Sequence, residues 1–266
     1  MTNLFKRGIS GLIYSVLFIS AIVYSKESYS ILIAIFGYIC IWEFLRLINF
    51  KNILPYLLFS GLLSLSFLSF DISIAIKTLF VFSFLGSLSL LINLYSKKPH
   101  KYSNLVQKLF ITIKYLLLPL CFLILLPLVN GVYQYSIILS VVIFIWVNDS
   151  FAFLVGKNFG KRKLFETISP KKTIEGFIGG LFFTVISAIV LSYFIDFLSM
   201  NHWVVIAIIA SVIGTIGDLV ESKFKRQAGI KDSGTIMPGH GGLLDRLDSL
   251  LFVAPFVYLY IHFLIF

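Results

Sequence analysis

Charged residues are scarce in this sequence, and cysteine is almost absent. Only 13% of the 266 residues are charged, whereas a soluble domain has about a quarter. Hydrophobic residues make up 59% of the chain, and its mean hydropathy is +0.98. The two cysteines, Cys40 and Cys121, lie inside separate apolar runs without metal-ligand spacing, which leaves them as ordinary helix residues. A soluble globular domain is therefore excluded.

Long runs of apolar residues make up much of the chain. A helix that crosses a hydrocarbon core of about 30 Å needs roughly 17 to 25 such residues, and runs of this length recur along the chain. Because the runs are continuous rather than alternating, they exclude a β-barrel. The predicted fold is all-α, a polytopic membrane protein with about nine transmembrane helices. The spans are expected near 9–24, 29–49, 53–70, 72–95, 112–130, 133–156, 174–199, 203–221 and 247–266.

The basic residues indicate how these spans are oriented. With the N-terminus in the cytoplasm, 20 of the 22 lysines and arginines fall in or beside cytoplasmic segments, and only Lys26 and Lys77 do not. The net charge of +10 is therefore assigned to cytoplasmic loops and anionic lipid headgroups, and no nucleic-acid partner is expected. We divide the chain into a hydrophobic bundle over 1–130 and a catalytic region over 131–266.

Polar residues concentrate in the second half of the chain. In the first 130 residues, Glu43 and Arg46 are three positions apart and are interpreted as a local ion pair. Asn148 and Asp149 interrupt the sixth apolar run, and a carboxylate at that depth marks a functional site by default. The alternative for Asp149 is a pair with a basic residue on a neighbouring helix.

The loop before the seventh span carries two adjacent lysines. Ser169 and Pro170 are typical of an N-cap and a first helical residue, which places Lys171 and Lys172 in the first turn. The helix dipole disfavours cations there, so the placement indicates a bound anion such as phosphate. Simple retention of positive charge in the cytoplasm is the competing interpretation.

The densest polar segment is GDLVESKFKRQAGIKDSGTIMPGHGGLLDRLDS, residues 217–249, which holds ten charges, five of each sign. Two carboxylate pairs share a one-turn spacing, and oxygen ligands of this kind suit Mg²⁺. The pairs are Asp218 with Glu221 and Asp245 with Asp248. Four basic residues beside them suit phosphate oxygens. These are Lys225, Arg226, Lys231 and Arg246.

The PGHGG turn, residues 238–242, lets the backbone approach a ligand closely. His240 in that turn has no second histidine or cysteine at metal-ligand spacing, which argues against zinc. It either binds a phosphate or braces the turn. The competing interpretation of the whole segment is a solvated loop whose charges pair with one another.

These residues resemble the phosphatidate cytidylyltransferases, also called CDP-diacylglycerol synthases. The family pattern is a serine, a lysine-arginine pair, a lysine-aspartate pair, HGG and a final DRxD. In this sequence the pattern is met by Ser222, Lys225-Arg226, Lys231-Asp232, His240-Gly241-Gly242 and Asp245-Arg246-Leu247-Asp248. The stretches at 148–149 and 169–176 are also similar to family sequence, so the resemblance covers about residues 148–249.

The resemblance implies a membrane nucleotidyltransferase that converts CTP and phosphatidic acid into CDP-diacylglycerol and pyrophosphate with Mg²⁺. It also implies a bacterial inner-membrane location, with the site facing the cytoplasm; a homodimer is a further expectation. We assign the metal to Asp218 and Asp245, with Asp248 and Glu221 as further ligands, and support to Asn148 and Asp149. The catalytic set is Asp218, Asp245, Asp248, Lys225 and Arg226. The substrate-phosphate set is Lys171, Lys172, Ser222, Lys231, Arg246 and His240.

Three other classes compete with this reading. An ion-coupled transporter also has intramembrane carboxylates, but its polar groups would lie at the midplane rather than at the cytoplasmic edge. A polyprenol kinase or another lipid-phosphate enzyme would use the same kinds of residue on a different lipid. A CDP-alcohol phosphotransferase is disfavoured because its DGxxAR-type motif is absent from the sequence.

Overall fold

The molecule is built almost entirely of helices. The computed structural model describes residues 3–67, 73–96, 99–100, 102–237, 239 and 241–265. Within these residues, seven helices are long and apolar enough to cross a membrane, so the predicted all-α membrane protein is confirmed. They are Lys26–Leu47, Lys77–Tyr95, Leu105–Leu125, Tyr135–Phe159, Ile174–Ser192, Met200–Gln227 and Leu244–Ile265. The count of nine and the cytoplasmic N-terminus stay predictions.

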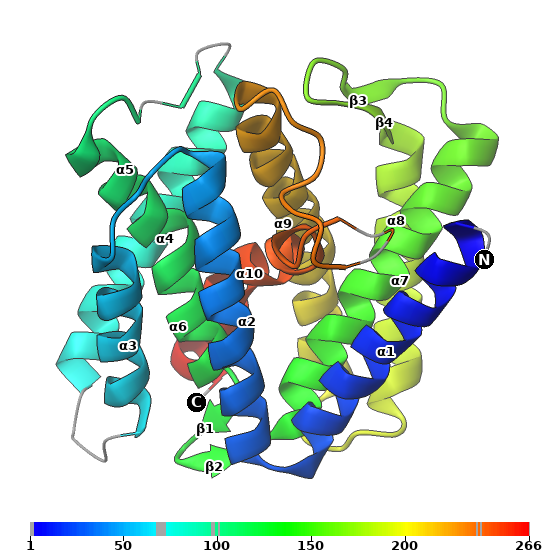
Figure 1. Ribbon diagram of the computed structural model, residues 1–266. Helices are drawn as coiled ribbons and strands as arrows, with labels where there is room; N and C mark the ends of the chain where they lie inside the picture. The colour runs from blue at the N-terminus through cyan, green and yellow to red at the C-terminus, as the bar shows by residue number, and fades with distance from the viewer. Residues whose placement is uncertain are drawn as a thin grey trace.

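In the described part of the first half of the chain, the helical structure falls into five hydrophobic segments. Figure 1 shows their arrangement. The fifth runs without a break from α5 through η1 to α6, and η1 is a π-helical turn between the two α-helices. A two-stranded hairpin follows at the lower end of the molecule in Figure 1. The bounds are α1 (Asn3–Tyr24), α2 (Lys26–Leu47), α3 (Leu54–Phe67), α4 (Ser73–Tyr95), α5 (Leu105–Thr112), η1 (Ile113–Leu117), α6 (Leu118–Leu125), β1 (Leu128–Val129) and β2 (Val132–Tyr133).

The second half supplies four long helices and a second hairpin. That hairpin, β3 paired antiparallel with β4, lies at the upper end of the molecule in Figure 1 and joins α7 to α8. The helices follow the predicted spans to within a few residues, except that α9 runs six residues further and α8 ends seven residues earlier. The bounds are α7 (Tyr135–Phe159), β3 (Lys163–Phe165), β4 (Ser169–Thr173), α8 (Ile174–Ser192), α9 (Met200–Gln227), α10 (Leu244–Leu259) and η2 (Tyr260–Ile265).

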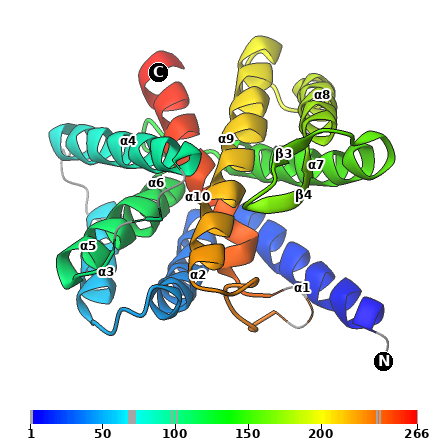
Figure 2. The ribbon, with the colours of Figure 1, turned by 90° about the horizontal axis from the view of Figure 1, so that it is seen from above.

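The helices α9 and α10 lie at the centre of the molecule when it is viewed from above (Figure 2). Helix α10 (Leu244–Leu259) packs against α9 and also against α2, α4, α6 and α7. After α9, residues 228–237 fold back from its upper end, and α10 begins near the middle of the molecule's height (Figure 1). The polar first turn of α10 is therefore surrounded by helices from both halves of the chain.

The seventh predicted span and α8 both begin at residue 174, but the predicted helix cap before it is wrong. Ser169 and Pro170 are not an N-cap and a first helical residue, because residues 169–173 form strand β4 and pair with β3. The N-cap of α8 is Thr173, whose Oγ1 accepts a hydrogen bond from the Gly176 N–H at 3.1 Å. Lys171 and Lys172 consequently lie in a strand and not in the first turn of a helix.

An aromatic cluster around Phe224 fixes the end of α9 that carries the polar residues. The Phe224 ring lies 5.3 Å from that of Phe44 on α2 and 5.0 Å from that of Tyr115 on η1. His100 stacks on the same ring at 4.0 Å, and burial lowers the pKa of this histidine to about 3, which keeps it neutral. The Gln227 side-chain amide also accepts a hydrogen bond from the His100 N–H and donates one to the His100 carbonyl oxygen. These contacts anchor the last turns of α9 to the first half of the chain.

Candidate active site

A cavity of about 650 Å³ lies where α7, α8, α9 and α10 approach the β3–β4 hairpin. Its wall contains five carboxylates and six basic side chains, a concentration of charge that is unusual between membrane-spanning helices. The acidic residues are Asp149, Asp218, Asp232, Asp245 and Asp248. The basic residues are Lys157, Lys163, Lys171, Lys172, Lys225 and Arg246.

Close packing of α9 on α10 brings two of these carboxylates into the same cavity. Gly214 and Gly217 on α9 face α10, and the Ser249 hydroxyl donates to the Gly214 carbonyl oxygen at 3.1 Å. With no side chain at Gly217, the Asp248 backbone passes directly beside it. Asp218 is the residue after Gly217 on α9, and Asp248 is the residue of α10 that Gly217 contacts. The predicted pairing of these two helices around carboxylates is therefore seen in the structure.

Substitution Gly217→Ala should lower the thermal stability of the protein. The new Cβ would lie 2.6 Å from Phe252 Cβ and 2.9 Å from the Asp248 carbonyl oxygen. Such overpacking costs about 1–3 kcal/mol, more than the roughly 1 kcal/mol that alanine gains over glycine in a helix. The melting temperature in detergent is the measurement. Gly61→Ala is the matched control because a Cβ there meets nothing within 4 Å; a Gly217→Ala protein as stable as this control would contradict the close packing.

An ion pair connects the hairpin to α9 across the cavity. The Lys172 Nζ lies 2.6 Å from Asp218 Oδ2, and the Ser222 hydroxyl donates to Asp218 Oδ1 at 3.1 Å. Burial alone would lower the pKa of Lys172, but the neighbouring Asp218 carboxylate raises it above its usual value. Lys172 is therefore held as a cation in the wall of the cavity, although its strand differs from the predicted helix turn.

Lys225, in the cavity wall, joins α9 to α10. Its Nζ lies 2.5 Å from Glu221 Oε2 and 2.6 Å from Asp245 Oδ1. Glu221 is fully buried behind this lysine and does not line the cavity, unlike its predicted partner Asp218. One lysine thus separates two carboxylates that would otherwise repel each other in a medium of low dielectric constant.

Asp245 holds the segment that precedes α10. Its Oδ2 accepts hydrogen bonds from the Gly242 N–H at 2.7 Å, the Ser233 N–H at 2.9 Å and the Ser233 hydroxyl at 3.0 Å. Gly241 has φ +88°, in the left-handed region that favours glycine, and a Cβ there would lie 2.6 Å from Asp245 Oδ2. Both Asp245 oxygens are engaged, so this residue shapes the turn as well as lining the cavity.

The polar interruption of α7 also faces the cavity. The Asn148 Oδ1 accepts a hydrogen bond of 2.6 Å from the Ser211 hydroxyl on α9, which fixes the amide. The same amide's Nδ2 lies 3.4 Å from Asp149 Oδ1. Asn148 and Asp149 both line the cavity, together with Lys172 and Asp218. The predicted convergence of Asn148 and Asp149 with the 217–249 segment is therefore present.

Two of the predicted site residues, Arg226 and Lys231, are not part of the cavity wall. The Arg226 guanidinium donates to the carbonyl oxygens of Ile168 and Ile230, so it ties the end of α9 to the hairpin and to the following loop. Lys231 is exposed on that loop and is not part of the cavity wall. Lys223, which belongs to the same charged segment, donates to carbonyl oxygens at the end of α4. His240 lies outside the described residues.

The prediction of an ion pair between Glu43 and Arg46 is wrong. The Glu43 carboxylate is fully buried and accepts hydrogen bonds from Leu243, Leu244 and Ser233, while the Arg46 guanidinium lies 5.8 Å from the centre of the Trp42 ring. The sequence did contain a signal that Glu43 has a special role, because it is a carboxylate inside a 22-residue apolar helix. Sequence reasoning also left five polar residues of the cavity wall without a role, three of them charged. They are Lys157, Lys163, Thr173, Thr215 and Asp232.

The cavity wall offers oxygen donors of the kind that Mg²⁺ binds together with substrate phosphates. Among the residues that the structure describes, no three histidine, cysteine, aspartate or glutamate side chains form a ready-made metal-binding group. Mg²⁺ usually takes only one or two carboxylates, keeps several waters and adds substrate phosphates. Asp218 and Asp248, on the two packed helices, offer such a pair of oxygen donors in the cavity wall.

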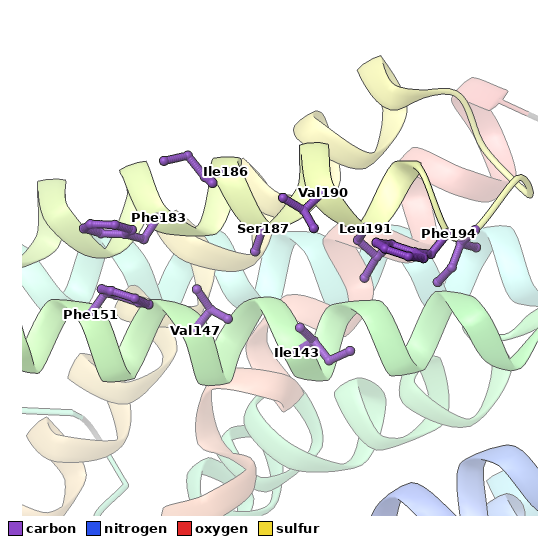
Figure 3. A pocket seen from close by; sticks show the side chains of 10 residues that line it. Ile143, Val147, Phe151, Phe183, Ile186, Ser187, Val190, Leu191 and Phe194 are labelled. Atoms are coloured by element: carbon purple, nitrogen blue, oxygen red, sulfur yellow. The ribbon is translucent and has the colours of Figure 1, made fainter.

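A second cavity is apolar and lies on another side of the α7–α8 pair. It has a volume of about 540 Å³, and Figure 3 shows side chains from both helices, such as Phe151 and Phe183, lining it. These two rings stack at 4.0 Å. Ser187 is the single polar residue in its wall, so this groove lacks the groups needed for chemistry on a charged substrate.

Fold and site together define a helical membrane protein with a charged cavity suited to phosphates and a divalent cation. The profile of the Cytidylyltransferase family matches residues 5–264, and the chain belongs to this family. The resemblance seen in the sequence and the predicted class, a nucleotidyltransferase, are thereby confirmed.

Named relatives support the same assignment. A phosphatidate cytidylyltransferase of Bacillus subtilis (strain 168) is 35% identical over 267 residues, covering 97% of each chain. Proteins of the same name from Staphylococcus aureus (strain COL) and Staphylococcus haemolyticus (strain JCSC1435) are 54% and 52% identical over 120 residues. Those two alignments span 44% of this chain and 46% of each relative, less than half their length.

Proposed function

We propose that this protein is a phosphatidate cytidylyltransferase of the bacterial inner membrane, with its site facing the cytoplasm. It would transfer the cytidylyl group of CTP to phosphatidic acid, giving CDP-diacylglycerol and pyrophosphate. The observation that carries the proposal is the charged cavity between the membrane helices, whose wall includes the motif residues of α9 and α10. The bacterial relatives and the bias of basic residues support the location.

The reaction requires two anions to meet. An oxygen of the phosphatidate phosphate forms a bond to the α-phosphorus of CTP, and the bond from that phosphorus to the β-phosphate oxygen breaks to release pyrophosphate. Positioning and charge stabilisation supply most of the catalysis in such transfers. Basic side chains in the cavity wall would bind the phosphates of both substrates and reduce their repulsion. They are Lys157, Lys163, Lys171, Lys172, Lys225 and Arg246.

The carboxylates have a separate task. Asp218 and Asp248 would hold Mg²⁺, and Asp149 would support that site from α7. When bound, Mg²⁺ polarises phosphoryl oxygens and offsets the charge that develops on the triphosphate. Ser222 orients Asp218 through its hydroxyl, and Asp245 fixes the turn. Phosphate binding by Lys231 and His240, support from Asn148 and a homodimeric state remain parts of the proposal that rest on the sequence.

Two radiolabels distinguish this activity from the alternatives. Purified protein in mixed micelles with phosphatidic acid should incorporate label into lipid from CTP labelled at the α-phosphorus, and only when Mg²⁺ is present. CTP labelled at the γ-phosphorus should give labelled pyrophosphate and no labelled lipid. Transfer of the γ-label to a lipid would instead identify a lipid kinase. No label in lipid from either nucleotide would reject the cytidylyl transfer.

A further inference from the structure

Helix α10 begins without a capping side chain of its own. Its N-cap residue is Leu243, which has no polar side chain to accept hydrogen bonds from the first turn. The first four N–H groups of a helix have no partner within the helix. Leu243 and Leu244 are both almost completely buried, so water cannot reach these groups freely, and an unpaired buried N–H group is costly.

Glu43 supplies the missing cap from another helix. Its Oε1 accepts a hydrogen bond from the Leu243 N–H at 3.1 Å, and its Oε2 accepts one from the Leu244 N–H at 2.7 Å. The carboxylate comes from α2, 200 positions earlier in the chain, and is fully buried. A negative charge at this end of α10 also interacts favourably with the helix dipole.

The loop before α10 is closely fitted to the same carboxylate. A Cβ atom on either Gly234 or Gly242 would overlap with the Glu43 side chain. The Ser233 hydroxyl lies 3.3 Å from Glu43 Oε2 and 3.0 Å from Asp245 Oδ2, so it stands between the two carboxylates. The second glycine of the HGG motif is therefore required where Glu43 meets the backbone.

We propose that Glu43 is a positioning residue, which caps α10 and thereby sets the place of Asp245 and Asp248 in the cavity. Asp245 is in the first turn of α10, immediately after the two amides that Glu43 binds, and Asp248 is one turn further. A shift of the first turn would move both carboxylates together. This inference rests on the proposed function for its catalytic part, whereas the capping contact is independent of any substrate.

Glu43→Gln is the decisive variant, with Glu27→Gln as its matched control. Glu27 is exposed near the opposite end of the same helix. Backbone amide exchange of Leu243 and Leu244, followed by mass spectrometry in detergent without substrate, should accelerate by about tenfold in Glu43→Gln, the effect of losing a hydrogen bond to a charged group. Exchange in the control should match that of the unmodified protein.

The kinetic readout separates positioning from simple loss of folded protein. Per molecule of monodisperse protein, kcat should fall by about tenfold or more in Glu43→Gln, while KM for CTP changes much less, because the phosphate-binding lysines stay in place. Glu43→Asp keeps the charge and should recover part of both the exchange protection and kcat. A purely structural role would reduce the yield of folded protein but leave kcat per folded molecule unchanged.

Each failure has a distinct meaning. Unchanged amide exchange in Glu43→Gln overturns the capping role, whatever the activity. Faster exchange with an unchanged kcat overturns the positioning role. If Glu43→Gln yields no folded protein, Glu43→Asp replaces it, since the shorter side chain keeps the charge but draws the carboxylate back from the Leu243 and Leu244 amides, and normal exchange together with a normal kcat there overturns the proposal. If the unmodified protein itself does not form CDP-diacylglycerol, the proposed function fails, while the exchange result still decides whether Glu43 caps α10.

Discussion

Replacement of Asp218 by asparagine should reduce CDP-diacylglycerol formation by about a thousandfold or more, the change expected when several kcal/mol of charge stabilisation are lost at a metal-assisted site. The substitution keeps the size of the side chain but removes its charge. It therefore weakens the proposed magnesium site and leaves Lys172, 2.6 Å away, without its carboxylate partner. The rate of label transfer from α-labelled CTP at saturating substrates is the measurement.

Two further variants show whether a loss of activity in Asp218→Asn comes from the metal site or from another effect of the substitution. Asp196→Asn makes the same chemical change at an exposed position between α8 and α9, and it should leave the rate unchanged. If Asp218 served only to neutralise Lys172, the double variant Asp218→Asn with Lys172→Met would regain activity, and a double-mutant cycle would reveal this coupling. A rate within tenfold of normal in Asp218→Asn alone would refute its assignment to the metal.

Replacement of Lys225 by methionine should strongly reduce the amount of folded protein. Lys225 Nζ is bonded to both Glu221 and Asp245, and Glu221 is fully buried. Removing one partner of a buried ion pair leaves an uncompensated charge and costs about 3–5 kcal/mol. Because native proteins are stable by only about 5–15 kcal/mol, this loss should be visible as a large fall in melting temperature and in the monodisperse yield from membranes.

The double variant Lys225→Met with Glu221→Gln tests the electrostatic explanation. It removes the lysine together with the fully buried charge of Glu221, and Asp245 keeps its hydrogen bonds from Ser233 and Gly242, so the variant should recover most of the lost melting temperature. Lys51→Met, at an exposed position between α2 and α3, controls for the loss of a lysine as such. A Lys225→Met protein as stable as this control would show that the three-residue network contributes little.

Most of the helices and much of the site could be predicted from local patterns. Continuous apolar runs marked the membrane helices because a lipid-exposed backbone must satisfy its own hydrogen bonds. The spacing of Asp218, Asp245 and Asp248 indicated carboxylates on two facing helices, which the structure brings to one cavity. Asn148 and Asp149 were recognised because polar residues inside an apolar run are expensive.

The errors arose where distant partners outweighed local propensity. Ser169 and Pro170 have the chemistry of a helix start, but pairing of β4 with β3 holds them in a strand, and Thr173 caps α8 instead. Glu43 and Arg46 have the spacing of a helical ion pair, yet Glu43 turns to amides 200 residues away. A local sequence pattern cannot identify a hydrogen-bond partner that lies 200 residues away.

The capping contact between α2 and α10 also has a consequence for the order of assembly. A chain is synthesised from its N-terminus, and its segments generally acquire structure in that order. Glu43 is made early and must be accommodated among apolar helices before the amides of Leu243 and Leu244 exist. Closing this contact spans 200 residues of chain, so it carries an entropic cost that only the completed bundle can offset. Maturation of the cavity is thereby coupled to insertion of α10, because a protein interrupted before Leu243 lacks the two amides that Glu43 binds.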